Sequence, residues 1–283
     1  MKRSRFGLIA FCVAAVILIA SAQSPAQLKR TITKTDRFDF GAGGTVAITG
    51  APNGAIRVTG TAKNEVVITA EIELQAASEA DLAKLGQMTG FATDESTIRT
   101  GIISIGVHNK FGQKKLPKDF PKTLLGQPFT INYVISVPHY SDLEIDGGKG
   151  DLSITGVEGS MRVNFLETKA TIEVVGGSTN VTIGTGSADV AFGVHGWRGR
   201  SANIQVATGN LNIKLPSNMS SEIDASILKT GKIENTLPDL KPRDRKVPFT
   251  ERSIIAKAGV GGAPLKFTVG DGMLKLAQLI LPL

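Results

Sequence analysis

Histidine and carboxylate side chains could do acid–base or metal chemistry in this 283-residue chain, and their spacing is the first test of that idea. The three histidines, His108, His139 and His195, lie far apart, and no two of them have the spacing of a metal-binding pair. A Gly-x-Ser-x-Gly nucleophile turn and a Gly-rich phosphate loop with its lysine are both missing from the sequence. The sequence therefore predicts no catalytic residue, no metal ligand and no cofactor.

Four aspartates, Asp142, Asp146, Asp151 and Asp189, allow one sharper hypothesis. Two carboxylates from neighbouring strands could act as acid and base in glycoside hydrolysis. However, Asp146 and Asp151 sit among glycines at turns, where an aspartate commonly bonds its own backbone. We expect structural roles for these residues and keep a periplasmic polysaccharide-acting enzyme as the alternative.

Two features of the sequence could bind a partner without catalysing a reaction. Trp197 lies between Gly196 and Arg198, where it could stack on a sugar or close the edge of a repeat. A basic segment, 109–127, carries Lys110, Lys114, Lys115 and Lys118, interleaved with Phe111 and Phe120. This segment could meet anionic glycans or headgroups, or be a solvated loop that its phenylalanines attach to the domain.

A repeated strand pattern over 141–215 must position any such site. Each unit is apolar, polar, apolar, followed by a turn rich in Gly, Asp, Ser or Thr, and units start about nine residues apart. Alternation with a period of two is typical of a strand, because successive side chains point to opposite faces. The eight apolar pairs are Leu143/Ile145, Leu152/Ile154, Met161/Val163, Ile172/Val174, Val181/Ile183, Val190/Phe192, Ile204/Val206 and Leu211/Ile213.

Short strands of this kind cannot bury a face alone, so neighbours must stack on one another. The turns lack a regular two-residue hairpin signal, which favours coiling over hairpins. The sequence therefore predicts an all-β fold, a β-solenoid or β-helix-like stack with two strands per coil. The pairs would point inward, and two outer columns would form, Glu144–Arg162–Thr182–Gln205 and Ser153–Glu173–Ala191–Asn212.

The chain before the repeat has three parts. Residues 1–22 resemble a secretory signal peptide, with Lys2, Arg3 and Arg5 before an apolar run and Ala20-Ser21-Ala22 as the cleavage site; an uncleaved anchor is the alternative. Cys12, the only cysteine, lies in this segment, so the mature chain needs no reducing compartment. Residues 23–37 read as a flexible leader, and 38–283 as a single β-repeat domain.

An insertion over 75–127 interrupts the β pattern. Ser78 and Asp81 resemble a helix capping box, and Leu82, Leu85 and Met88 share one helical face, so a short helix is expected before the long basic loop. A second polar loop follows at 237–252. The open ends of a solenoid need covers. We expect the N-terminal region with its helix, and the apolar C-terminal strand at 265–281, to provide them.

The strand motifs also suggest a family. Asn132–Pro138 reads Asn-Tyr-Val-Ile-Ser-Val-Pro, and Gly150-Asp151-Leu152-Ser153-Ile154 and Thr208-Gly209-Asn210-Leu211 repeat a Gly-polar-Leu theme. In these motifs, and in Gly270-Asp271-Gly272, the chain resembles the bacterial putative-adhesin β-strand-repeat family, a domain of unknown function. The resemblance implies export to the cell envelope and a β-helix-like stack, and it supplies no catalytic residues.

The charge balance limits the partners. Without Lys2, Arg3 and Arg5, 29 of the 32 basic residues remain against 25 acidic ones, a mild excess spread along the chain, which does not indicate nucleic acid. We expect an exported, non-catalytic binding or structural module of the periplasm, outer-membrane surface or extracellular space. Its partner would be an unknown protein or glycan, and a membrane only through an uncleaved first segment. A self-assembling envelope scaffold is a further alternative.

Overall fold

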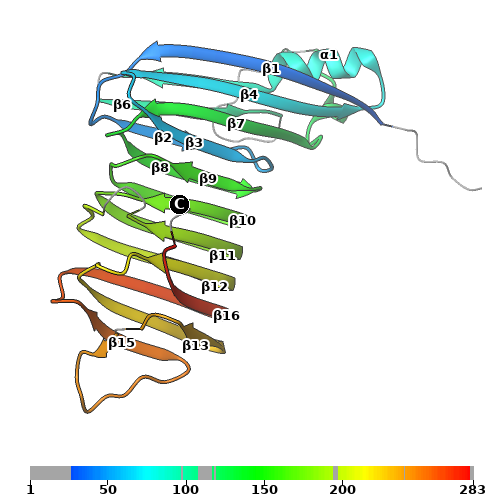
Figure 1. Ribbon diagram of the computed structural model, residues 1–283. Helices are drawn as coiled ribbons and strands as arrows, with labels where there is room; N and C mark the ends of the chain where they lie inside the picture. The colour runs from blue at the N-terminus through cyan, green and yellow to red at the C-terminus, as the bar shows by residue number, and fades with distance from the viewer. Residues whose placement is uncertain are drawn as a thin grey trace, which may run out of the picture.

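The computed structural model describes residues 27–96, 98–107, 117, 119–193, 197–238 and 240–280, and these residues form an all-β fold (Figure 1). Within this part of the chain, sixteen strands join in one sheet that does not close on itself. The strands are β1 (Leu28–Asp39), β2 (Thr45–Thr49), β3 (Ile56–Thr61), β4 (Glu65–Ala76), β5 (Gly90–Glu95), β6 (Arg99–Ile105), β7 (Phe129–Pro138), β8 (Asp142–Lys149), β9 (Leu152–Thr155), β10 (Met161–Val174), β11 (Ser178–Phe192), β12 (Ser201–Leu215), β13 (Ser221–Asn235), β14 (Lys241–Pro242), β15 (Ser253–Ala258) and β16 (Ala263–Gln278).

The repeat forms parallel layers, as its turns predict. Leu143 in β8 pairs with Met161 in β10, and Met161 pairs with Thr179 in β11, so each step advances 18 residues, or two repeat units. β9 lies beside the second half of β10, with Leu152 next to Ala170. All sixteen residues of the predicted apolar pairs are at most 1% exposed, which confirms that they fill the interior.

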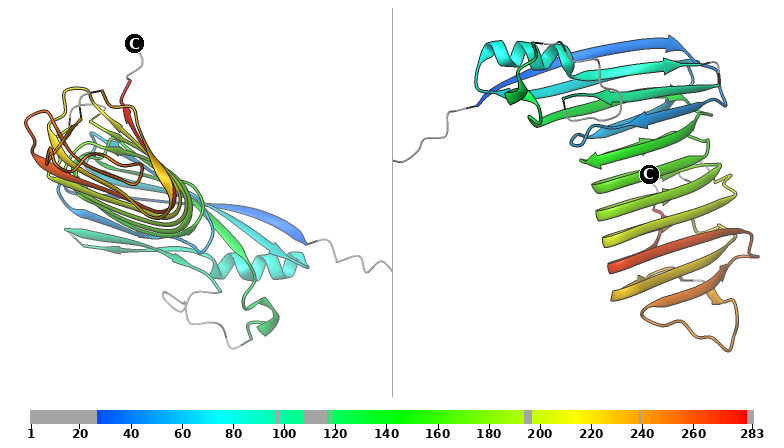
Figure 2. Two further views of the ribbon diagram at one scale, coloured as in Figure 1. Left: turned by 90° about the horizontal axis from the view of Figure 1, so that it is seen from below. Right: turned by 180° about the vertical axis from the view of Figure 1, so that it is seen from behind.

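The prediction of two separate strands per layer is wrong for the central layers. From β10 onward each layer is one continuous strand of 14 to 16 residues that bends in the middle. Viewed along the stack, the bent strands superimpose and give each layer a first arm before the bend and a second arm after it (Figure 2, left). In four successive layers the bend contains a glycine with positive φ: Gly186, Gly209, Gly272 and Gly231.

The predicted outer columns are partly wrong. Glu144 does lie beside Arg162, and Thr182 beside Gln205, but Arg162 neighbours Asn180 rather than Thr182, and Ser153 neighbours Thr171. The reason is that an arm buries three alternate residues and not two, as in Met161, Val163 and Phe165. Aligning pairs in the sequence therefore shifts the register by two residues in some layers.

The N-terminal end corrects the prediction of a flexible leader over 23–37 for the part of that range, from residue 28 on, that forms a strand. Residues Leu28–Asp39 form β1, which pairs with β4 along its whole length. Its inward residues alternate as in any strand, but Arg30, Lys34 and Asp36 are among them. These charges find partners: Arg30 pairs with Glu79, and Lys34 Nζ donates to the carbonyl oxygen of Thr89 at 2.7 Å. A polar inner face hid the strand from a search for apolar alternation.

The predicted helix is present as α1 (Glu79–Met88), capped by Ser78, whose side chain accepts from the amide of Asp81. Leu82 and Leu85 are buried where α1 packs against β4 and β1. Figure 1 shows α1 at the β1 end of the stack. Among the residues that the structure describes, no helix is long and apolar enough to cross a membrane. The predicted signal segment, 1–22, lies outside the described residues.

The C-terminal strand is not a cover, which corrects a second expectation. β16 lies between β12 and β13, with Ala202 beside Leu265 and Leu265 beside Ile223. The far end of the stack is built instead from β13, β15, β14 and the polar loop (Figure 1). Here the amide of Ile233 donates to the carbonyl oxygen of Glu251, 2.6 Å away, so the loop satisfies the outer edge of β13.

Candidate functional site

The predicted partner-binding residues are only partly placed. Lys110, Lys114, Lys115 and Lys118 lie outside the described residues. From the same segment, Phe120 packs against the core. Trp197 also packs against the core, edge-on to Phe192 with ring centroids 6.1 Å apart. This position fits the closing of a layer edge better than an exposed stacking surface.

The residues considered for chemistry mostly bond within the stack. The carboxylate of Asp142 accepts from the amide of Ser160 (2.6 Å), Asp146 accepts from Asn164 Nδ2 (2.7 Å), and Asp189 accepts from Asn212 Nδ2 (2.7 Å). The sequence suggests that Asp146 bonds the backbone of its own turn. In the structure it bonds a side chain of the neighbouring strand instead. His139 Nδ1 lies 2.7 Å from the carbonyl oxygen of Gly156, which places the proton of this hydrogen bond on the ring. His108 and His195 lie outside the described residues.

A polar groove of about 190 Å³ crosses the outer side of the first arm. It runs over four adjacent strands, β2, β8, β10 and β11. These strands are parallel and in register, so their first residues lie side by side. Alternation sends the odd-numbered Leu143 and Met161 into the core and the even-numbered residues outward. The outward polar residues that line the groove are Thr45, Asp142, Glu144, Ser160, Arg162, Ser178 and Asn180.

Charges are fixed along this groove by a chain of ion pairs. Glu144 lies between two arginines, with its Oε2 atom 2.6 Å from Arg99 Nη2 and 3.3 Å from Arg162 Nη2. The hydrogen bond from Arg99 is the main cause that lowers the pKa of Glu144, and the bond from Arg162 lowers it further. Arg162 is also 3.7 Å from Asp146. The guanidinium groups and carboxylates are therefore held in place, while their side chains stay partly exposed to solvent.

An exposed aromatic residue, Tyr140, belongs to the turn that precedes the groove residue Asp142 in the sequence. Tyr140 is 57% exposed and lies two residues before Asp142, while its carbonyl oxygen accepts from the amide of Gly43. By contrast, Tyr133 is buried, where burial raises the pKa of its phenol to about 12 and Ser104 is its partner at 2.8 Å. Tyr140 thus lies two residues along the chain from a side chain that lines the groove. No sequence pattern singled out Tyr140, since it falls in the turn before the first repeat.

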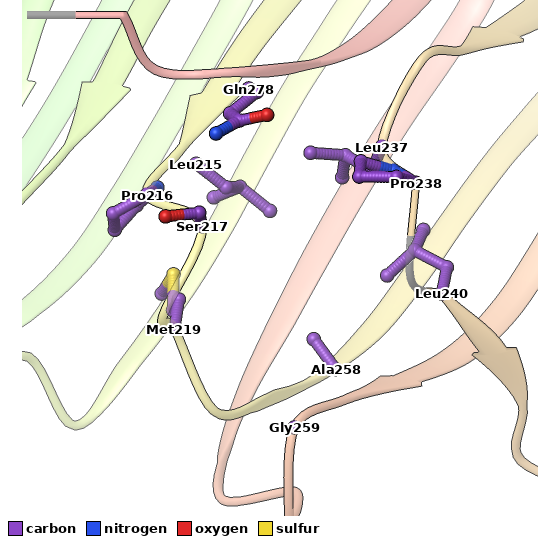
Figure 3. A pocket seen from close by; sticks show the side chains of 10 residues that line it. All are labelled: Leu215, Pro216, Ser217, Met219, Leu237, Pro238, Leu240, Ala258, Gly259 and Gln278. Atoms are coloured by element: carbon purple, nitrogen blue, oxygen red, sulfur yellow. The ribbon is translucent and has the colours of Figure 1, made fainter.

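Two other depressions lie outside this groove. An apolar cavity of about 60 Å³ lies where chain segments cross between the arms (Figure 3). Leu215, Met219, Leu237 and Leu240 point into it. Its volume is well below the several hundred Å³ of a usual ligand pocket, so it has room for a side chain at most. The other, a wide hollow of about 620 Å³, lies near the ends of β1 and β5.

The described residues contain no group of three or more His, Cys, Asp or Glu side chains that could hold a metal ion.

No protein-family model matches the chain, and no curated protein matches it. Solved structures are similar to it over most of its length. A putative cell adhesion protein from Clostridium sporogenes is 12% identical, covers 88% of this chain and 100% of its own, and has a TM-score of 0.47. A putative adhesin from Bacteroides fragilis is 8% identical, with 88% and 97% covered and a TM-score of 0.27. A putative lipid binding protein from Parabacteroides distasonis is 10% identical, with 86% and 96% covered and a TM-score of 0.27. The solved structures to which this chain is similar therefore include proteins of several bacteria that are described as putative adhesins or as a cell adhesion protein, all at low sequence identity.

Proposed function

We propose that this chain is an exported, non-catalytic module of the cell envelope, adhesin-like in role, that binds a glycan through the groove on its first arm. In this proposal the bent layers are the coils of a β-solenoid, which makes the outer surface long, regular and stiff. The observation that carries the proposal is the groove itself, lined by Asp142, Glu144, Arg162 and Asn180, with Tyr140 exposed in the turn before Asp142.

The chemistry of these groups suits a sugar. A pyranose ring presents apolar C–H faces that can lie on an aromatic ring, and hydroxyl groups that both donate and accept hydrogen bonds. Carboxylates accept from hydroxyls, guanidinium groups donate to them, and the amide of Asn180 does both. The ion pairs around Glu144 hold these groups in one arrangement before a ligand arrives, which reduces the entropy cost of binding.

The enzymatic alternative receives less support from the same groove. Its two acids, Asp142 and Glu144, both come from β8 and do not face each other across the groove from different layers. The pKa of Glu144 is lowered, whereas a general acid in glycoside hydrolysis needs a raised pKa. A carboxylate held by two arginines is better suited to positioning than to proton transfer.

A glycan array probed with the chain lacking residues 1–22, followed by calorimetry on the best ligand, tests the proposal. Tyr140→Ala and Arg162→Ala should each weaken binding at least tenfold. Val134→Ala, which trims a side chain that is 49% exposed on β7, outside the groove, should leave it unchanged. Binding that survives both groove substitutions, or release of reducing sugar from the ligand, would contradict the proposal.

A further inference from the structure

The two ends of the stack differ in how they treat their edge strands. At one end β1 runs for 12 residues and pairs only with β4, so its other edge has no strand partner among the described residues. Strands in globular proteins are usually about five or six residues long, and proteins avoid long open edges because they pair with other chains. β1 contains no proline and shows no break in its register with β4. It is therefore a long template for one more strand.

The opposite end is blocked. Its edge strand, β14, has only two residues, and the second is Pro242, which has no amide hydrogen to donate. The polar loop bonds to the second arm of β13 at Ile233, whose amide donates to the carbonyl oxygen of Glu251. The amide of Ile227 likewise donates to the carbonyl oxygen of Arg252 at 2.9 Å. Growth of the sheet is thus open at one end and closed at the other.

We propose that two copies of this chain associate through β1, edge to edge and antiparallel, about a two-fold axis through Thr33. Each copy would extend the sheet of the other, and the blocked ends would point away from the axis. Because only one end can add a strand, the assembly stops at two copies and does not grow into a filament. This inference is independent of the proposed glycan site.

The residues of β1 select the register. A two-fold axis normal to the sheet keeps outward residues opposite outward residues, so only pairings that preserve the alternation are allowed. With the axis at Thr33, this residue faces its own copy and Thr31 faces Thr35, all three exposed on the outer side. Threonine pairs of this kind stabilise antiparallel strands.

The inner side agrees with the same register. Arg30, which also pairs with Glu79 of its own copy, would face Asp36 of the other copy, and Leu28 would face Phe38, which are favourable cross-strand pairs. Moving the axis to Lys34 would place two lysines opposite each other, and moving it to Ile32 would place Arg30 opposite Lys34. With the axis at Thr33, one pair is unfavourable, Lys29 against Arg37. The repulsion between these two charges is reduced because Arg37 already pairs with Glu65.

Sedimentation velocity of the chain lacking residues 1–22 tests the association over a hundredfold range of concentration. The mass should rise from one copy to two and stop there. Thr33→Glu should weaken self-association at least tenfold by placing two carboxylates on the axis, while Thr182→Glu, at an exposed threonine of β11, should not. A constant single-copy mass, or a mass that grows past two copies, would overturn the proposal.

Thiol crosslinking tests the register without relying on the fold of a charged variant. The chain that lacks residues 1–22 also lacks Cys12, the only cysteine of the sequence, so each introduced cysteine is alone. Directly opposite Cβ atoms lie about 5 Å apart, within reach of a short bifunctional thiol reagent. Thr33→Cys should crosslink to its own copy, whereas Thr31→Cys should crosslink only when mixed with Thr35→Cys. Equal crosslinking of Thr31→Cys alone would rule out this register.

Discussion

The carbonyl oxygen of Gly186 occupies the space that a Cβ atom on Gly209 would need. The two glycines are neighbours across β11 and β12, and each has positive φ, 129° and 134°. The same relationship continues from Gly209 to Gly272 and from Gly272 to Gly231. Close approach of backbone to backbone at the bend is therefore what lets successive layers superimpose.

Gly209→Ala should destabilise the fold by about 3 kcal/mol or more, because the new methyl group meets backbone that cannot move aside and the φ value is unfavourable for alanine. Urea unfolding followed by circular dichroism would measure the loss. Gly41→Ala is the matched control, since nothing lies within 4 Å of its added Cβ atom and its φ is ordinary. Equal stability of the two variants would show that the bend tolerates a side chain.

Removing the charge of Glu144 should make stability less dependent on pH. Because folding lowers the pKa of this carboxyl, its ion pairs stabilise the fold above the ordinary carboxyl pKa, and the contribution is lost as pH falls through the lowered value. Glu144→Gln should cost about 0.5–1 kcal/mol near pH 7, the range for partly exposed pairs. The difference from the unmodified chain should shrink as the pH falls below the ordinary carboxyl pKa and disappear below the lowered one.

Glu167→Gln is the control for this measurement. Glu167 pairs with Lys149 at 2.9 Å, but both side chains are more than half exposed, at 55% and 62%. Exposed pairs contribute little because water screens them. If Glu167→Gln cost as much as Glu144→Gln across the pH range, the two arginines around Glu144 would have no special effect.

Removal of β16 should unfold more than the strand itself. A chain that stops at residue 262 exposes one edge of β12 and one of β13, which β16 joins along its whole length. Amide hydrogen exchange should therefore show loss of protection across β13 and β15, together with reduced protection of β12. A chain that lacks only residues 281–283 keeps β16 and should exchange like the full chain. Retained protection of β13 and β15 without β16 would contradict the strand order.

The tryptophan fluorescence of this protein comes from Trp197 alone, since it is the only tryptophan of the chain, so the emission spectrum reports the surroundings of this ring. Its fluorescence should be that of a ring packed against Phe192, at shorter wavelength than in urea. Trp197→Ala should cost about 2–3 kcal/mol through lost packing. Trp197→Phe should cost less, because Nε1 is buried and has no hydrogen-bond partner among the described residues. A native spectrum typical of a ring in water would instead support an exposed stacking role.

The sequence predicted those features that depend on neighbouring residues. Alternation identified the inward pairs, Ser78 with Asp81 identified the start of α1, and the contact between Glu144 and Arg162 followed from stacking in parallel layers. Each of these depends on spacing within one or two repeat units, which the sequence displays directly.

The features that were missed depend on contacts between distant segments. β1 is stabilised by β4 and by partners of Arg30 and Lys34 that lie 49 and 55 residues away. The position of β16 depends on which edge it pairs with, and its alternation is the same for an internal strand and a covering one. Tyr140 is a candidate binding residue only because Asp142, two residues further on, lines a groove that forms when β2, β8, β10 and β11 come together, so no local pattern could mark it.

The place of β16 also bears on how the chain acquires its structure. From β8 to β12, each layer can be laid down as the chain is made or exported, since it lies next to a strand that precedes it. β13 breaks this order, because the layer on which it rests is encoded downstream of it. Residues 216–262 must therefore wait, unsupported, until the last strand emerges, and the end of the stack built from residues 216–280 should form in a single late and cooperative event.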